Sequence, residues 1–167
     1  MVDEEQKVFQ KIVDLMKTEP EDSLKISPLV AILDSIKGRN TSRLKEIVKQ
    51  YGWPGKSLVG EDGANAAWLL IQHADRDRKF QRYCLELMKE AAQKGEIPLQ
   101  HVAYLTDRLL VAEGKKQIYG TQFTTENGKL VPFPIENEAD VDKRRKEVGL
   151  PPLSEYIKRL KKIYQDK

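Results

Sequence analysis

Apolar residues recur every three or four positions along most of the chain, with polar residues between them. This spacing puts the apolar side chains on one face of a helix, so it predicts a chain built mainly from amphipathic helices. The first helix is expected to end at Glu19-Pro20, because proline cannot continue a helix. Further helices are expected over residues 27–38, 41–51, 61–74, 77–94, 98–114, 138–147 and 153–165.

Two of these helices have clear boundary signals. Ser27 can cap a helix that has Pro28 in its first turn, and Gly38 can end it before Thr41 caps the next one. The segment 61–74 differs from the others because its apolar residues leave no polar face. Such a helix is buried, so this segment is expected to be the central helix of the fold.

After residue 114 the apolar positions alternate, which is the pattern of strands. Runs 117–123 and 129–135 flank Asn127-Gly128, the dipeptide most typical of a two-residue hairpin turn. Pro132 and Pro134 place the second strand at a sheet edge. The predicted fold class is therefore mainly α (α+β): a single-domain helical bundle with a central buried helix and one β-hairpin.

Composition and charge narrow the class of protein. The 167 residues are 40% hydrophobic and 33% charged, which excludes a disordered or membrane-embedded chain. The acidic start, Asp3 to Glu5, is unlike a signal peptide, and the single cysteine, Cys84, suits a reducing cytoplasm. We therefore expect a soluble cytoplasmic protein with no membrane partner.

The last 25 residues carry nine basic and three acidic residues, whereas the first 142 have a net charge of −3. A basic tail can meet an anionic partner or lie across the acidic body. Nucleic acid is not the expected partner, because acidic residues interrupt the basic face and it has few aromatic residues.

Polar residues interrupt apolar segments at three places. Residues 72–75 put Gln72, His73 and Asp75 at the end of the expected buried helix, where unpaired polar groups are costly. Asp107 and Arg108 lie inside a second helix near its apolar face. The third place is the strand pattern of residues 117–122, whose polar side chains could face solvent or form a wall of a site.

Together these residues predict a polar pocket. His73 would transfer protons, and Asp107 or Asp75 would orient its ring. Arg108 would contact an anion, with Tyr119, Thr121 and Gln122 as further polar wall residues beside Gln72. No cofactor fingerprint is present, and no metal is expected, because His73 and Asp75 point to different sides of a regular helix. The same residues could instead form a buried structural network.

The chain resembles an uncharacterised bacterial family, domain of unknown function 6624. The resemblance covers about residues 44–155 and is carried by Gly52-Trp53-Pro54, Val59-Gly60, Gln72-His73-Ala74-Asp75, Phe80-Gln81, Tyr104-Leu105-Thr106-Asp107-Arg108, Gln117-Ile118-Tyr119-Gly120-Thr121-Gln122, Arg144-Arg145 and Val148-Gly149-Leu150. It implies that these polar residues belong to one set, and it adds Gln81, Arg144 and Arg145 as substrate-binding candidates. The N-terminal helices (1–40) and the C-terminal helix (153–165) would pack on this core within one domain, 1–167.

Two functional hypotheses follow. The first is a metal-independent hydrolase or lyase that uses acid–base chemistry on a polar, anionic small molecule or nucleotide-like substrate. The second is a binding or interaction module without chemistry, in which the His, Asp and Arg side chains hold the core together.

Overall fold

A computed structural model describes residues 2–18 and 23–165. The chain divides into two compact units, Met1–Cys84 and Leu85–Lys167, and each is described by itself. The described residues form helices and one two-stranded antiparallel hairpin, which confirms the predicted mainly-α class. Whether the units act as the single expected domain stays a prediction, and the expected stop at Glu19-Pro20 lies outside the described residues. No helix among the described residues is long and apolar enough to cross a membrane.

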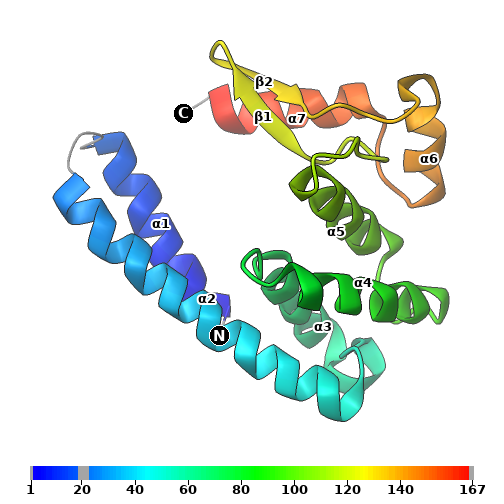
Figure 1. The fold of residues 1–167 in the computed structure, drawn as a ribbon. Coiled ribbons are helices and arrows are strands. Elements are labelled where there is room, and N and C mark those ends of the chain that lie inside the picture. Colours follow the sequence, from blue (N-terminus) through cyan, green and yellow to red (C-terminus); the bar gives the residue numbers. More distant parts are fainter. Residues whose placement is uncertain (1, 19–22, 166–167) are drawn as a thin grey trace. The chain divides into compact units, whose positions relative to one another are not determined.

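The first unit contains α1 (Val2–Thr18), α2 (Ser23–Tyr51), α3 (Lys56–Gln72) and the start of α4 (Arg78–Gln93). Figure 1 shows α1 running antiparallel beside the first half of α2. The core of this unit is aliphatic and includes Ile12, Leu33, Ile36, Leu44, Val48 and Ile71. The antiparallel pairing brings the N-terminal turns of α1 next to the middle of α2.

Helix α2 corrects one prediction, because residues 23–51 form one continuous helix where two were expected. Pro28 lies inside it and removes only one backbone donor, near the helix start. Gly38 keeps a negative φ, and Ser42 donates its hydroxyl hydrogen to the Gly38 carbonyl from within the helix. The helix therefore continues through residues 38–41, because the packing of α1 along this stretch outweighs the local preference for a helix end there.

Helix α3 contains the buried residues Ala64, Ala67, Leu70 and Ile71 of the expected central helix. It begins earlier than predicted, at Lys56, and its first seven residues are exposed. Gly60 adopts φ +73 and kinks the helix there, a conformation that a residue with a Cβ rarely adopts. The helix ends at Gln72, so His73 is the C-terminal cap residue.

The second unit contains the rest of α4, α5 (Leu99–Ala112), β1 (Phe123–Glu126), β2 (Lys129–Pro132), a 3₁₀ turn at Glu138–Asp140, α6 (Val141–Glu147) and α7 (Leu153–Gln165). Its hairpin, α6 and α7 share a small apolar core made by Ile135, Val141 and Leu153, with Phe123 and Ile157 packed against it. This core holds α7 close to the hairpin.

The predicted hairpin is present, but its first strand was placed wrongly. Strand β1 begins at Phe123, whereas residues 117–122 form a loop with one isolated bridge from Gln117 to Ile135. The loop forms because Asp107 accepts hydrogen bonds from several of its backbone N–H groups, which a strand would need for its own ladder. Gly120 has φ +67, which also breaks strand geometry.

Candidate functional site

His73 is held by a carboxylate that the sequence analysis did not select. Its Nδ1 lies 2.5 Å from Oε1 of Glu5, which comes from the first turns of α1. The Glu5 side chain is 6% exposed and that of His73 is 28% exposed. A buried carboxylate at Nδ1 fixes the ring orientation and leaves Nε2 as the nitrogen available for proton transfer.

The environment of Glu5 keeps it ionised. Burial alone would raise the pKa of Glu5, but the hydrogen bond and charge of His73, the amide of Asn40 and the charge of Lys37 lower it overall. Asn40 donates to the second carboxylate oxygen at 3.2 Å from α2. An ionised Glu5 accepts a hydrogen from Nδ1 and stabilises a positive charge on the ring when Nε2 is protonated.

His73 lines two hollows of the first unit. The larger has a volume of about 430 Å³ and is lined by Asp34, Lys37, Gly38, Thr41, Ser42, Lys45, His73, Ala74, Asp75, Arg76 and Asp77. The smaller, of about 150 Å³, is lined by Glu5, Gln6, Phe9, Leu33, Lys37 and His73. His73 and Lys37 line both hollows, so a small molecule in the larger hollow would lie next to His73 of the Glu5–His73 pair, which we call the dyad.

Ion pairs organise the wall of the larger hollow. The Lys45 ammonium lies 2.5 Å from Asp77 and 5.5 Å from the centre of the Phe80 ring. The hydrogen bond from Lys45, together with that from the Phe80 backbone N–H, lowers the pKa of Asp77. Arg76 pairs with Asp34 across the same hollow. Cationic side chains thus line the hollow beside the imidazole, and most of them are already positioned by carboxylates.

Gln81 shapes the turn that follows His73. It is fully buried, and its Nε2 donates to the carbonyls of Ile71 at 2.9 Å and Gln72 at 3.3 Å, near the C-terminus of α3. The same atom lies 3.4 Å from Asp75, and Arg78 donates to Oε1 of Gln81 at 3.0 Å. Gln81 therefore supplies donors to the last carbonyls of α3 and positions residues 72–75.

The second unit contains a separate polar cluster centred on Asp107. This carboxylate is fully buried in α5 and accepts hydrogen bonds from the backbone N–H groups of Ile118, Tyr119 and Thr121. The Thr121 hydroxyl donates to it as well, at 2.9 Å. Several donors on one buried carboxylate make a strong, directional support for a loop.

The side chains of Gln117 and Gln122 make further hydrogen bonds within the same loop. The fully buried Gln117 side chain donates to the carbonyls of Gln122 and Phe133 and accepts from the Gln122 backbone N–H. The Gln122 side chain donates to the Thr121 hydroxyl at 3.1 Å. Residues 117–122 are thereby held in a fixed conformation next to the hairpin.

The two arginines bind backbone carbonyls. Arg144 donates to Ile118, Glu136 and Asn137. The fully buried Arg145 donates to Tyr119, Gly120 and Pro151, and its guanidinium lies 4.9 Å from the centre of the Tyr156 ring. Both side chains of α6 thus hold the loop 117–122 by its carbonyl groups, whereas Asp107 holds it by its N–H groups.

The remaining candidates are Tyr119 and Arg108. Burial, with the charges of Asp107 and Glu147, raises the pKa of Tyr119. Arg108 is half-buried on α5. No group of three His, Cys, Asp or Glu side chains that could hold a metal ion is found among residues 2–18 and 23–165.

A model of a protein family of unknown function, DUF6624, matches residues 1–167. The chain belongs to this family. The match extends over the whole chain, beyond the 44–155 segment that the resemblance covered. No curated protein and no solved structure matches the chain.

In this DUF6624 protein the predicted site residues form two clusters, one in each unit. Gln72, His73, Asp75 and Gln81 belong to the first unit, and Asp107, Arg108, Tyr119, Thr121, Gln122, Arg144 and Arg145 to the second. The orientation of His73 by Asp107 stays a prediction, because the two lie in separately described units. Glu5 was missed, although it lies at helical spacing with Phe9 and Ile12 on an apolar stripe, where a carboxylate is unexpected.

Proposed function

We propose that this DUF6624 protein is an acid–base enzyme, a metal-independent hydrolase or lyase that acts on a polar, anionic small molecule. The observation that supports this proposal is the Glu5–His73 pair, in which a buried ionised carboxylate meets Nδ1 of a partly exposed imidazole beside a hollow of about 430 Å³. Functional sites commonly combine ionisable groups, burial and a concave surface in this way.

The roles follow from the contacts. Nε2 of His73 would remove a proton from a bound water or from the substrate, and would return it to the leaving group in a later step. Glu5 would stabilise the imidazolium that forms in between. Lys37, which lines both hollows, and Arg76 would attract an anionic substrate. Asp75, at the wall of the larger hollow, stays a candidate for a second acid–base group.

The test begins with ligands that co-purify with the full chain, identified by mass spectrometry, and with turnover of phosphoester, carboxylic ester and hydroxy-acid panels. His73→Asn and Glu5→Gln should each lower kcat by about 100-fold or more, because general acid–base catalysis contributes that much. Glu4→Gln is the matched control, since Glu4 is an exposed neighbour that pairs with the exposed Arg39. Full turnover in both dyad variants would exclude the proposal.

A second candidate function is a binding module, and the Asp107 cluster favours it. Asp107, Gln117 and Arg145 are fully buried and make hydrogen bonds to the loop 117–122 and its neighbours. That arrangement is typical of a structural network, because most of these hydrogen bonds are made with backbone groups of the loop and its neighbours. If His73→Asn lowers only stability and no substrate is turned over, this second function is the better one.

Location and partners complete the proposal. The single cysteine, Cys84, is consistent with a reducing cytoplasm. A small-molecule ligand is the expected partner, and nucleic acid is not, since glutamates and aspartates interrupt the basic C-terminal segment. Binding to a nucleic acid that weakens steeply with salt would contradict the last expectation.

A further inference from the structure

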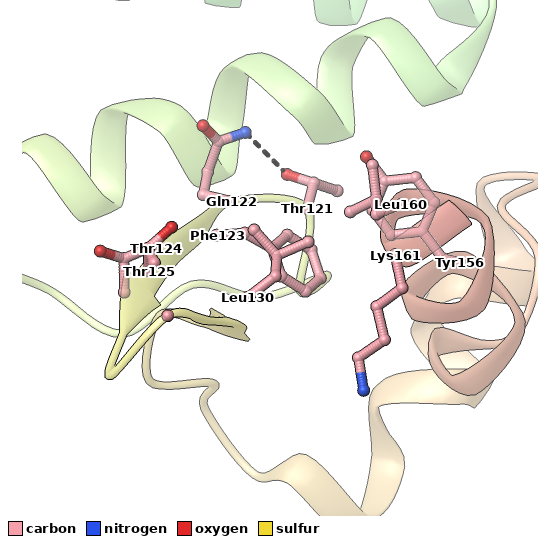
Figure 2. A pocket seen from close by; sticks show the side chains of 10 residues that line it. Thr121, Gln122, Phe123, Thr124, Thr125, Leu130, Tyr156, Leu160 and Lys161 are labelled. Atoms are coloured by element: carbon pink, nitrogen blue, oxygen red, sulfur yellow. Dashed lines mark hydrogen bonds between the residues drawn. The ribbon is translucent and has the colours of Figure 1, made fainter. Parts of the chain in front are cut away.

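The second unit contains a groove between the β-hairpin and α7, which the proposed function does not use. Its volume is about 520 Å³, and it is lined by Thr121, Gln122, Phe123, Thr124, Thr125, Gly128, Leu130, Tyr156, Leu160 and Lys161. Figure 2 shows Phe123 and Leu130 on the hairpin side and Tyr156, Leu160 and Lys161 on the α7 side. The groove therefore combines apolar side chains with threonine hydroxyls and one ammonium group.

The strand register shows which backbone groups point away from the hairpin. Phe123 pairs with Pro132, Thr124 with Val131 and Thr125 with Leu130. The bond from the Phe133 N–H to the Gln122 carbonyl, 3.1 Å, makes the pair just before β1 a hydrogen-bonded one. Because bonded and non-bonded pairs alternate in antiparallel sheets, the N–H and C=O groups of Phe123 and Thr125 point outward from β1.

The two edges of the hairpin are not equivalent. Pro132 occupies an outward-facing position of β2 and has no N–H to offer, and Pro134 follows immediately. Prolines at an edge prevent another strand from pairing there. No other strand of the described chain pairs with β1, so its edge keeps its donors and acceptors available.

The groove follows the open edge. Five consecutive residues, 121–125, line it, whereas β2 contributes only Leu130. Phe123, Thr124 and Thr125 are consecutive residues of β1 whose side chains point to alternate faces, so a cavity that touches all three reaches the edge of this strand. The edge is also rigid, because Asp107 and Arg145 hold residues 118–121 and the Phe123 ring packs edge-on against Tyr156 at 5.7 Å.

We propose that this groove binds an extended peptide segment with acidic side chains, which adds to β1 as a third strand. The exposed Lys161 of α7 lines the groove, so acidic side chains complement this wall. Phe123, Leu130 and Leu160 form the apolar part of the groove. Binding between an edge strand and a helix uses main-chain hydrogen bonds for affinity and side-chain contacts for specificity. Strand β1 has four residues, about 13 Å of edge, which suits a peptide of about six residues.

The experiment uses the full chain labelled with ¹⁵N and an acetylated, amidated hexapeptide of alternating valine and glutamate. Hydrogen exchange measured by NMR should slow by about tenfold at the Phe123 and Thr125 amides in the saturated complex, since those N–H groups gain partners. The amides of Thr124 and Glu126, which pair with β2, should change little. The same peptide with lysine in place of glutamate should bind at least about tenfold more weakly.

Two single variants separate the groove from general charge attraction. Lys161→Glu should weaken binding of the glutamate peptide by about tenfold or more, whereas Lys162→Glu, a neighbour that does not line the groove, should weaken it by about twofold at most. Equal losses in both variants would overturn the proposal. So would an absence of protection at Phe123 and Thr125, or concentration-dependent protection there without peptide, which would assign the edge to a second copy of this chain. Each of these results is independent of His73 and Glu5.

Discussion

The imidazole of His73 and the carboxylate of Glu5 are in hydrogen-bond contact at 2.5 Å, although they are 68 residues apart in the chain. The contact exists because α1 runs beside α2 and α3, which brings its first turns to the C-terminus of α3. A buried carboxylate in this position is costly unless it is paired, so Glu5 and His73 depend on each other. This pairing links the stability of the first unit to its proposed chemistry.

The Glu5–His73 pair predicts a specific dependence of stability on pH. The folded-state pKa of Glu5 is lowered below the ordinary 4.5, so its ionisation stabilises the fold above about pH 4.5 and this contribution disappears as the pH falls through the lowered value. Glu5→Gln should therefore lower the free energy of unfolding at pH 7 by about 1–2 kcal/mol. Between pH 5 and 3 the variant should lose less stability than the wild type. Urea unfolding at several pH values measures the loss of stability at pH 7 and its dependence on pH. Glu4→Gln, which changes an exposed carboxylate, should have the same free energy of unfolding as the wild type at each pH.

The Asp107 cluster predicts that this carboxylate stabilises the second unit. Asp107→Asn keeps the size of the side chain but replaces one acceptor oxygen by a donor, which then faces the N–H groups of the loop 117–122. We expect a loss of about 2–4 kcal/mol, measured as the free energy of unfolding in urea. Asp62→Asn, at an exposed position on α3, should change it by less than about 0.5 kcal/mol. A similar small change in Asp107→Asn would contradict a structural role.

The sequence predicted the regular elements well where local signals were strong. The Asn127-Gly128 turn, the edge position of Pro132 and the stripe of α7 are present as expected. It failed where tertiary contacts decided the outcome. Helix α2 continues through Gly38 because α1 packs along it, and residues 117–122 form a loop because Asp107 binds their N–H groups.

The candidate site was predicted only in part, because its contacts also depend on how the helices pack. Polar groups that interrupt apolar patterns identified His73 and Asp107, and the family resemblance added Gln81 and Arg145; all four have specific partners in the structure. It could not identify the partners themselves, since Glu5 and His73 meet only through the packing of α1. A carboxylate on the apolar stripe of the first helix was the available signal for Glu5.

Cys84 should be unreactive in the folded protein. It is fully buried, and desolvation, with a smaller effect of Asp77, raises the pKa of its thiol to about 12. The thiolate, which is the reactive form, is therefore scarce at pH 8, and a reagent cannot reach the sulfur. Titration with a thiol reagent should give no rapid reaction in buffer and one equivalent in urea. Rapid labelling of the folded chain would show that Cys84 becomes exposed by local opening.

Gly120 offers a matched test of how closely the loop 117–122 is packed. It has φ +67, and a Cβ at this position would lie 2.9 Å from Cδ1 of Ile135 and 3.0 Å from Cδ1 of Leu153. Gly114 has nearly the same backbone conformation, φ +69, but a Cβ there would meet nothing within 4 Å. Gly114→Ala should therefore cost about 1 kcal/mol from backbone strain alone, whereas Gly120→Ala should cost about 2–4 kcal/mol because steric overlap adds to it. Urea unfolding of the two variants measures the difference. Equal losses would mean that Ile135 and Leu153 move aside, and the core between the hairpin and α7 would then be softer than its contacts indicate.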